Sequence, residues 1–478
     1  MKRPVYHQNR RCCAGSDILP VLGRRHTVLP AEGGGELAGA LNGVGMGIIR
    51  ANWGPLNKAV AFEPSTNVNA VFGNGNTEDL ITEMFSGGIS SGYFVRCGTG
   101  GTAPTITLKD NAKADVVTIT GAYVGDRAFS VSVRDSLTGD GRECIIYEGT
   151  TEFLKVTFEA DTKEPAGLAA AINAATKDFI AKATAAGSGV MATVTQSAMT
   201  KGTQPTAAVS EYSAALDAFD AVRGNVICVD TDDAAVHALV QAYITRTFTG
   251  GGYLMGCVAE NKGVEFDTRT THAAAFNDEK MHYCVNGALN ATGDDYNGYK
   301  LAARIGGMIA SVASNVALTH TVVKGFVDLD EGLTNSQIEK ALKRGCIVLT
   351  KNASGQVQIE QGINTLVSPD GDMDAGWKKI RRTKERFELM QRIDDSLDPI
   401  VGKLDNDSDG RATVIAMGKA IIAAMVGEKK LTSGDMYEDD SNPPQGDSAW
   451  FILDIVDKDS LEHVYLAYKF RFATEVSE

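Results

Sequence analysis

Three residues in the middle of the chain have side chains that a serine hydrolase uses to move protons. Asp230 closes an apolar strand, and His237 and His272 follow it in the chain. Such an enzyme also needs a serine whose hydroxyl a histidine activates. No serine lies in a G-x-S-x-G elbow or at a Gly-Thr-Ser helix start, so we interpret this region as a scaffold without catalysis. Asp230 itself stands where a helix N-cap is expected.

Two other kinds of segment resemble ligand loops. "DNDSDGRATVIA" begins like a calcium loop, but its twelfth position, where a bidentate Glu is needed, is Ala416. We expect an acidic turn before a helix that starts near Arg411. The glycines of "GTGGTAP" and "GVGMG" lack the G-x-x-x-x-G-K-[ST] phosphate pattern. The sequence therefore predicts no catalytic residue, metal or cofactor. The acidic residues of the first loop are Asp405, Asp407 and Asp409, followed by Gly410.

Composition excludes several further classes. A net charge of -14 argues against a nucleic-acid binder, which normally has a basic surface. The longest apolar runs, such as 420–426, are far shorter than the roughly 18 residues that span a bilayer. The basic N-terminus lacks the apolar region of a secretory signal, so folding in a cytoplasm is expected. The 8 cysteines form no C-x-x-C pair, and we expect each of them to be reduced or buried.

Periodicity divides the chain into segments that would position any site. A strand, a turn at Trp53-Gly54-Pro55 and a second strand precede a helix that we expect Thr77 to cap. From about 101 to 208, Thr, Val and Gly alternate in the manner of a small β-domain inserted into the chain. From 212, helices and strands alternate as in an α/β domain.

The segment "NGYKLAARIGGMIASVAS" has an apolar stripe at helical spacing. Gly306 and Gly307 lie inside it, and each costs about 1 kcal/mol relative to alanine in a helix. We therefore expect close packing against another backbone, either within the domain or at a subunit contact. The next helix carries a capping box, Thr334 with Gln337.

Two segments near the C-terminus are candidates for contacts with partners. "WKKIRRTKERFELMQRI" is strongly basic in an acidic chain, and its cations form either a solvated helix face or a contact surface. In "HVYLAYKFRFATEV", apolar and other residues alternate, which predicts a strand with one apolar face. The apolar positions are Val464, Leu466, Tyr468, Phe470 and Phe472.

The order of several motifs resembles the contractile tail sheath proteins of bacteriophages and tailocins. These motifs are "IIRANWGPLNKAV", "GAYVGDRAFSVSV", "RTTHAAAFNDEKMHY", "NGYKLAARIGGMIA", "LTNSQIEKALKRGCIVLT", "VQIEQGINTL", "WKKIRR" and "IVGKLDNDSDGRATVIA". They span most of residues 45–475, whereas the first 40 residues match poorly.

This resemblance implies a mosaic of α/β and α+β domains. The expected parts are an N-terminal arm (1–35), an N-terminal segment (36–100), an inserted β-sandwich (101–208), a subtilisin-like α/β domain (209–360), a C-terminal α+β domain (361–463) and a C-terminal strand or arm (464–478).

It also implies a structural subunit that polymerises as stacked rings around an inner tail tube and contracts to drive the tube through a bacterial envelope. The implied partners are further copies of the chain, the tube, the baseplate and the tail terminator, with assembly in the host cytoplasm. We expect the basic residues to face the tube and the terminal strand to join a neighbour's sheet. The basic residues are Lys378, Lys379, Arg381 and Arg382.

Two other classes remain as alternatives from the residues alone. One is an α/β hydrolase or nucleotide-binding enzyme with an inserted β-domain, which would need a cleft of convergent titratable groups. The other is a monomeric binding or adhesion module, in which the terminal strand would pair inside its own chain.

Overall fold

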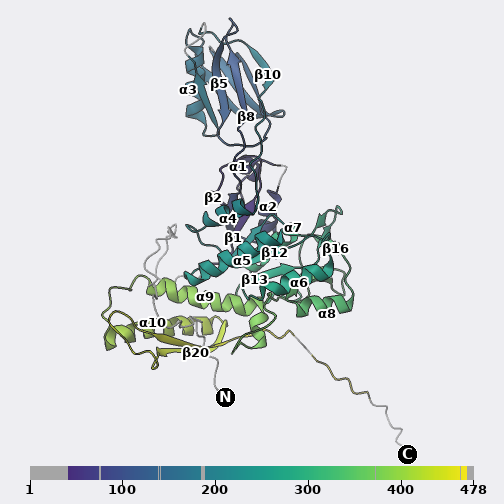
Figure 1. The fold of residues 1–478 in the computed structure, drawn as a ribbon, viewed down its shortest axis with the longest axis vertical. Helices are drawn as coiled ribbons and strands as arrows, with labels where there is room; N and C mark the ends of the chain where they lie inside the picture. Colours follow the sequence, from purple (N-terminus) through teal and green to yellow (C-terminus); the bar gives the residue numbers. More distant parts are fainter. Residues whose placement is uncertain are drawn as a thin grey trace, which may run out of the picture.

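A seven-stranded sheet forms the centre of the molecule in this computed structural model, which describes residues 41–74, 77–137, 139, 141–184, 189–371, 373–462 and 465–470 (Figure 1). Its order is β17-β13-β12-β11-β1-β3-β2, and neighbours are parallel except β2 with β3. Parallel strands are buried on both faces, which explains their unbroken apolar runs. The strands are β1 (Val44–Ile49), β2 (Ala59–Phe62), β3 (Ser91–Arg96), β11 (Val226–Val229), β12 (Met255–Ala259), β13 (Met281–Cys284) and β17 (Cys346–Ile347).

Helices cover both faces of this sheet. On one face, Met84 of α2 and Ile305 of α7 pack against Cys257 of the sheet. On the other face, Val240 of α5 packs with Ile227, together with residues of α4, α6 and α8. The fold is therefore mixed α/β, as the sequence predicts. The helices are α1 (Val68–Phe72), α2 (Asp79–Gly87), α4 (Val209–Asp217), α5 (Ala234–Thr249), α6 (Phe266–Phe276), α7 (Tyr299–Ser311) and α8 (Asn335–Lys343).

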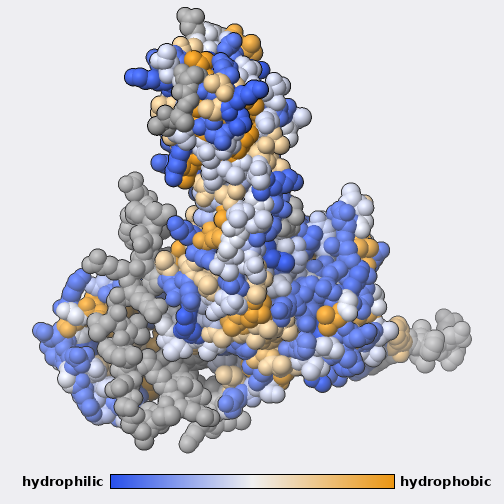
Figure 2. Space-filling model, turned by 45° about the horizontal axis from the view of Figure 1, so that its top comes forward, coloured by the Kyte–Doolittle hydropathy of each residue, from blue (hydrophilic) through white to orange (hydrophobic). Residues whose placement is uncertain are grey.

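The β-rich block projects from this body as a separate lobe (Figures 1 and 2). Its strands form a four-stranded sheet, β10-β6-β7-β8, and a three-stranded sheet, β4-β5-β9, around one hydrophobic core. Trp53, which belongs to the body by sequence, is part of that core. The elements are β4 (Thr105–Lys109), β5 (Asp115–Gly121), β6 (Ser130–Asp135), β7 (Arg142–Glu148), β8 (Thr151–Phe158), α3 (Glu164–Ala175), β9 (Phe179–Ala183) and β10 (Val194–Ala198).

The C-terminal part lies on the opposite side of the body from the lobe (Figure 1). Two long helices and an antiparallel hairpin share a small core that includes Ile393, Ile422 and Met436. These elements are η1 (Ala375–Lys378), α9 (Ile380–Leu397), α10 (Ser408–Gly427), β20 (Leu431–Glu438) and β21 (Phe451–Asp457). The small sheets beside the body are β14 (Ala288–Asn290), β15 (Asp295–Tyr296) and β16 (Phe326–Leu329), and β18 (Leu349–Lys351) with β19 (Val357–Ile359).

Helix α10 is long and apolar enough to cross a membrane by length and composition alone. Within the described chain, its residues Ile421, Ile422 and Met425 pack against α9 and β20. Its other side carries small residues that are exposed in the single chain, such as Ala416 and Ala420.

Local helix signals in the sequence predict one of three helix caps correctly. The capping box of Thr334 and Gln337 is confirmed at the start of α8. The predictions of two other caps are wrong. Helix α5 is capped by Asp233, not Asp230, and the N-cap of α2 is Glu78, not Thr77. Asp230 and Thr77 instead bond to each other in the interior, where a tertiary contact replaces the local one.

Candidate functional site

The crevice where an α/β protein most often binds a ligand is occupied by an internal ion pair. Such crevices lie at the carboxyl ends of strands where the strand order changes direction, here between β1 and β11. Arg50 follows β1 and Asp230 follows β11, and the Arg50 backbone N and Nε lie 2.7 and 2.9 Å from Asp230 Oδ2. Tyr212 donates its hydroxyl to Asp230 Oδ1 at 2.5 Å. Asp230 is fully buried, so no acceptor there is left for a ligand.

The electrostatics of this cluster also fit a structural role. Burial works against the charged Arg50 guanidinium, but Asp230 outweighs it and raises the pKa of Arg50. Burial, together with the nearby Asp230 carboxylate, raises the pKa of Tyr212. Arg50 therefore stays charged and Tyr212 stays protonated, and neither is poised to exchange a proton near neutral pH.

The two histidines considered as catalytic partners point elsewhere. His237 Nε2 lies 2.8 Å from the carbonyl oxygen of Thr231, and burial lowers the pKa of His237. His272 Nδ1 lies 2.9 Å from a carboxylate oxygen of Glu260. Neither contact leads to Asp230 or to a serine, so the described residues bring together no Ser-His-Asp arrangement.

The acidic loop before α10 is a helix cap. Asp407 Oδ1 accepts hydrogen bonds from the backbone N of Asp409 at 3.1 Å and of Gly410 at 2.8 Å. This geometry caps α10 and leaves the carboxylates at the surface. Within the described ranges, no three His, Cys, Asp or Glu side chains are grouped as metal ligands.

Gly306 and Gly307 allow close packing inside the body. A Cβ on Gly306 would lie 2.5 Å from Cys228 Sγ of the sheet beneath α7. A Cβ on Gly307 would collide with the carbonyl oxygen of Met84 and lie 3.0 Å from the Cα of Gly87, both on α2. The sequence leaves open whether the glycines pack within the domain or at a subunit contact, and these contacts fall within one chain.

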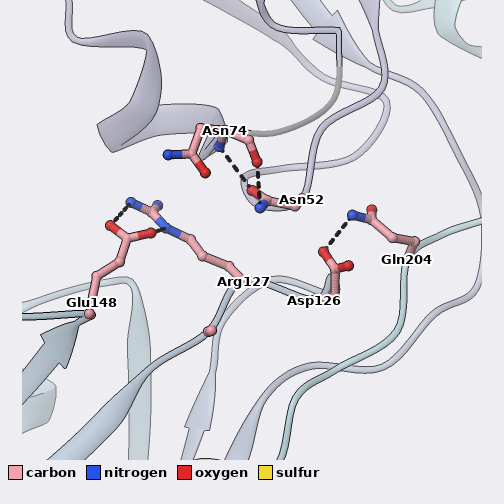
Figure 3. Close-up of a pocket in the computed structure, with 8 residues that line it drawn as sticks. Asn52, Asn74, Asp126, Arg127, Glu148 and Gln204 are labelled. Atoms are coloured by element: carbon pink, nitrogen blue, oxygen red, sulfur yellow. Dashed lines mark hydrogen bonds and ion pairs between the residues drawn. The ribbon is translucent and has the colours of Figure 1, made fainter.

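A polar pocket of about 360 Å³ lies at the neck between the lobe and the body (Figure 3). Beside it, Arg127 is 3% exposed and forms a two-pronged ion pair with Glu148, with N–O distances of 2.8 and 2.9 Å. Its guanidinium also lies 5.8 Å from the ring centroid of Trp53. The lining residues are Asn52, Asn74, Asp126, Arg127, Ala128, Glu148, Gly149 and Gln204.

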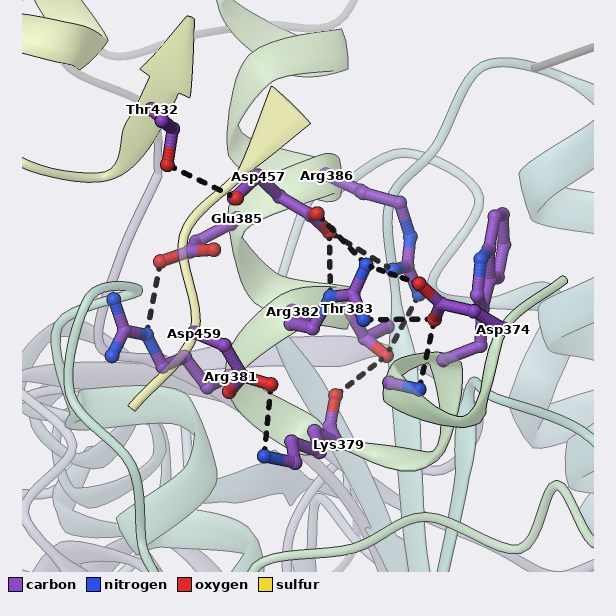
Figure 4. A network of polar contacts seen from close by, with 12 residues as sticks. Asp374, Lys379, Arg381, Arg382, Thr383, Glu385, Arg386, Thr432, Asp457 and Asp459 are labelled. Atoms are coloured by element: carbon purple, nitrogen blue, oxygen red, sulfur yellow. Dashed lines mark hydrogen bonds and ion pairs between the residues drawn. The ribbon is translucent and has the colours of Figure 1, made fainter. Parts of the chain in front are cut away.

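Most of the basic stretch is engaged within its own chain (Figure 4). Arg382 pairs with Asp457 of β21 and with Asp374, and Lys379 pairs with Asp459. The remaining partners are also internal: Arg381 Nε lies 3.0 Å from Glu385 Oε1, and Lys378 Nζ lies 3.0 Å from the carbonyl oxygen of Val367.

These contacts correct the interpretation of the basic stretch as a freely solvated helix face. Arg381 is only 8% exposed. Asp457 and Asp459 follow this stretch by more than 70 positions. A short run of cations therefore does not reveal these acidic partners in the sequence. The only sequence signal was the excess of positive charge itself.

The C-terminal segment lies away from the body. Leu466, Tyr468 and Phe470 are 68%, 74% and 90% exposed, and the described residues 465–470 belong to no strand. Val464 and Phe472 lie outside the described residues, as does the predicted N-terminal arm (1–35). Exposed apolar residues in a row are typical of a surface that binds another chain.

The described residues thus form an α/β body whose crevice is filled by internal contacts, a projecting β-lobe and an exposed apolar stretch at 465–470. Residues 205–365 match the family model described as the phage tail sheath protein central domain. The resemblance found in the sequence is thereby confirmed.

Solved structures give the same answer for the fold. The sheath tail protein of Desulfitobacterium hafniense is 18% identical, with a TM-score of 0.70 over 90% of this chain and 100% of that one. The sheath tail protein Lin1278 of Listeria innocua is 16% identical, with a TM-score of 0.66 over 88% and 96%. The contracted helical sheath of the anti-feeding prophage is 9% identical, with a TM-score of 0.54 over 94% and 99%. No match was found among curated proteins.

Proposed function

We propose that the protein is the structural subunit of a contractile tail sheath. Many copies polymerise around an inner tail tube, and contraction drives the tube through a bacterial envelope. The observation that supports this proposal is the match of residues 205–365 to the model of the tail sheath central domain, together with a fold that is similar to a sheath tail protein over 90% of the chain. The similarity of the α/β body to subtilisin is part of the same proposal.

The mechanism needs no cofactor or nucleotide, because the work comes from repacking contacts between subunits. Such transitions combine rigid bodies with flexible connections. The backbone contact between Gly87 and Gly307 and the insertion of Trp53 into the lobe support a body that moves as a unit. The terminal arms would then serve as hinges that keep neighbouring subunits connected.

We infer that the C-terminal segment adds a strand to a sheet of a neighbouring subunit. Its apolar residues alternate, it is exposed, and it has no strand partner in the described chain. The β20–β21 hairpin is a two-stranded sheet, and such a sheet has two open edges that can accept another strand. Main-chain pairing of this kind would let one subunit hold the next.

A tube contact through Lys378, Lys379, Arg381 and Arg382 stays a prediction. Three of these four cations already have carboxylate partners in the chain, so a tube would have to compete with the fold for them. Reversing their charge would therefore disturb the body as well as any tube contact. Contacts with a baseplate and a tail terminator, and assembly in the host cytoplasm, belong to the same proposal.

Negative-stain electron microscopy of the purified full chain tests the proposed function directly. A sheath subunit is expected to form hollow cylinders as its concentration rises. An α/β hydrolase, a nucleotide-binding enzyme or a monomeric binding module is expected to give single globular particles at every concentration. Globular particles alone, including in the presence of tubes, would refute the sheath proposal.

A further inference from the structure

The base of the C-terminal segment is held to the body by ion pairs. Strand β21 ends at Asp457, and residues 458–462 belong to no helix or strand. Lys379 Nζ lies 2.9 Å from Asp459 Oδ2 and 3.5 Å from Glu462 Oε1. Arg382 Nε and Nη2 lie 2.7 and 2.8 Å from the two carboxylate oxygens of Asp457. Figure 4 shows Lys379 turned toward Asp459 and Arg382 turned toward Asp457.

Most members of these pairs are shielded from solvent, although Asp459 is 40% exposed. The side chains of Lys379, Arg382 and Glu462 are 20%, 12% and 8% exposed. Two-pronged Arg–carboxylate pairs are geometrically specific, and partial burial reduces screening by salt. Burial opposes the charge of Arg382, but the Asp457 and Asp374 carboxylates outweigh it and raise the pKa of Arg382.

A further contact joins Glu462, at the base of the C-terminal segment, to the α/β body. Thr319 Oγ1 donates a hydrogen bond to Glu462 Oε2 at 3.0 Å. Glu462 is therefore held from two sides, by Lys379 before α9 and by Thr319 from the loop after α7. Beyond it, the described residues 465–470 are exposed. The point at which the segment leaves the body is thus set by these side chains and not by strand pairing.

We propose that Lys379 and Arg382, with Asp457, Asp459 and Glu462, form an arm latch that fixes where the C-terminal segment leaves the body. The inference rests on the proposed function, in which this segment connects subunits. Without the latch, tension on the segment would act first on the last residue pair of the hairpin, Leu431 with Asp457. The main-chain bonds between β20 and β21 would then break one after another. With the latch closed, tension passes into α9 and the body.

Trypsin digestion of the unassembled chain reports whether the latch is open, because Lys458 is an exposed residue of the latched stretch 458–462. The double variant Lys379→Gln with Arg382→Gln removes both cations but keeps side-chain length. We expect cleavage after Lys458 to become about tenfold faster, since local opening controls access for the protease. Cleavage after Lys469, which is exposed, is the internal reference. Lys378→Gln is the matched control, because Lys378 contacts Val367 and no latch residue.

A substitution that keeps the charge separates a latch from a general loss of stability. Lys379→Asp is expected to speed cleavage after Lys458, and Lys379→Arg, which keeps the cation, to retain the slow rate. Higher salt should speed cleavage in the wild type and have less effect in the double Gln variant. In the Lys379 variants the thermal unfolding of the body should change little, as judged by circular dichroism, whereas Arg382→Gln also removes a contact with Asp374.

The outcome for the latch is separate from the outcome for the sheath. Unchanged cleavage at Lys458 in the double Gln variant, or equally fast cleavage in Lys379→Arg and Lys379→Asp, overturns the latch whether or not cylinders form. If wild-type protein forms no cylinders but the cleavage results are as expected, the latch stands and the sheath proposal falls. Where cylinders form, those of the double Gln variant should dissociate at lower denaturant concentration than those of Lys378→Gln; equal dissociation would show that the latch bears no load.

Discussion

Gly87 of α2 and Gly307 of α7 bring the backbones of their two helices into direct contact. A Cβ built on Gly87 would lie 2.8 Å from the Cα of Gly307 and 2.9 Å from the backbone N of Met308. Real Cβ atoms do not approach so closely, so both positions require glycine. Helix α2 connects β2 with β3, and α7 covers β11 and β12, so this contact ties the two halves of the sheet together.

Gly307→Ala should therefore destabilise the body. The added methyl collides with the Met84 carbonyl oxygen, and backbone atoms cannot yield as a flexible side chain can. Overpacking of this kind costs typically 1–3 kcal/mol. Urea unfolding followed by circular dichroism measures the loss. Gly427→Ala at the end of α10 is the control, because nothing lies within 4 Å of its added Cβ. Equal stability of the two variants would contradict the close contact.

Trp53 should hold the lobe to the body. It is fully buried in the core of the lobe, with ring centroids 5.2 Å from Phe129 and 5.3 Å from Tyr123. Trp53→Ala is expected to cost about 3–5 kcal/mol and to lower the unfolding temperature of the lobe. Trp53→Phe keeps a ring in place and should cost less. Differential scanning calorimetry makes the comparison, and an unchanged lobe transition in Trp53→Ala would refute the role.

Stability should fall between pH 6.5 and 4 because of His282. Burial lowers the pKa of His282 from 6.5 to about 4, against the opposing hydrogen bond to the Gly256 carbonyl oxygen. In this window the unfolded chain binds a proton on His282 and the folded chain does not, so acid favours unfolding. The contribution of neutral His282 to the free energy of unfolding is fully present above pH 6.5. Roughly 3 kcal/mol of it is lost near pH 4.

The test compares wild type with His282→Phe, which removes the titrating group but keeps an apolar ring in the core. Urea unfolding at pH 7 and at pH 4.5 gives the pH dependence for each protein. The variant should lose less stability on acidification than the wild type. The same loss in both proteins would mean that other groups control the acid sensitivity. Asp278 and Lys384 are the charged neighbours that act on His282.

Deletion of residues 464–478 should leave a soluble, folded monomer that fails to polymerise. The described residues of this segment are exposed and contribute nothing to the four hydrophobic clusters of the body and lobe. Circular dichroism and sedimentation measure folding and assembly. An unfolded monomer would show that the segment belongs to the core of its own subunit. Normal cylinders would show that the segment does not connect subunits.

Thiol counting should recover all 8 cysteines of the denatured chain. The cysteines within the described residues are free and buried, and burial raises the pKa of thiols such as Cys144 and Cys97 to about 12. In the native protein the six cysteines of the described residues, which are buried, should react slowly with a thiol reagent. Fewer free thiols in freshly made protein would indicate disulfides and contradict this expectation.

Periodic patterns in the sequence predict the kinds of element, and the order of several motifs resembles the tail sheath family. The alternation of strands and helices after residue 212 predicts the α/β body, and Thr334 with Gln337 predicts the start of α8, because these signals act over a few residues. The absence of an activated serine likewise follows from local motifs. The alternating terminal segment could be recognised as unpartnered apolar surface, but its partner could not be named.

Tertiary structure alone decided the roles of the polar and small residues. Thr77 and Asp230 have the local appearance of helix caps, yet they meet in the crevice because the chain brings positions 153 residues apart into contact. Gly306 and Gly307 show only that a close approach exists, and the partner backbones of the sheet and of α2 become known only when the body is packed. The basic stretch was visible as charge, but its pairing with Asp457 and Asp459 depends on the return of the chain to α9. A local pattern sets what a side chain can do, and the folded neighbours set what it does.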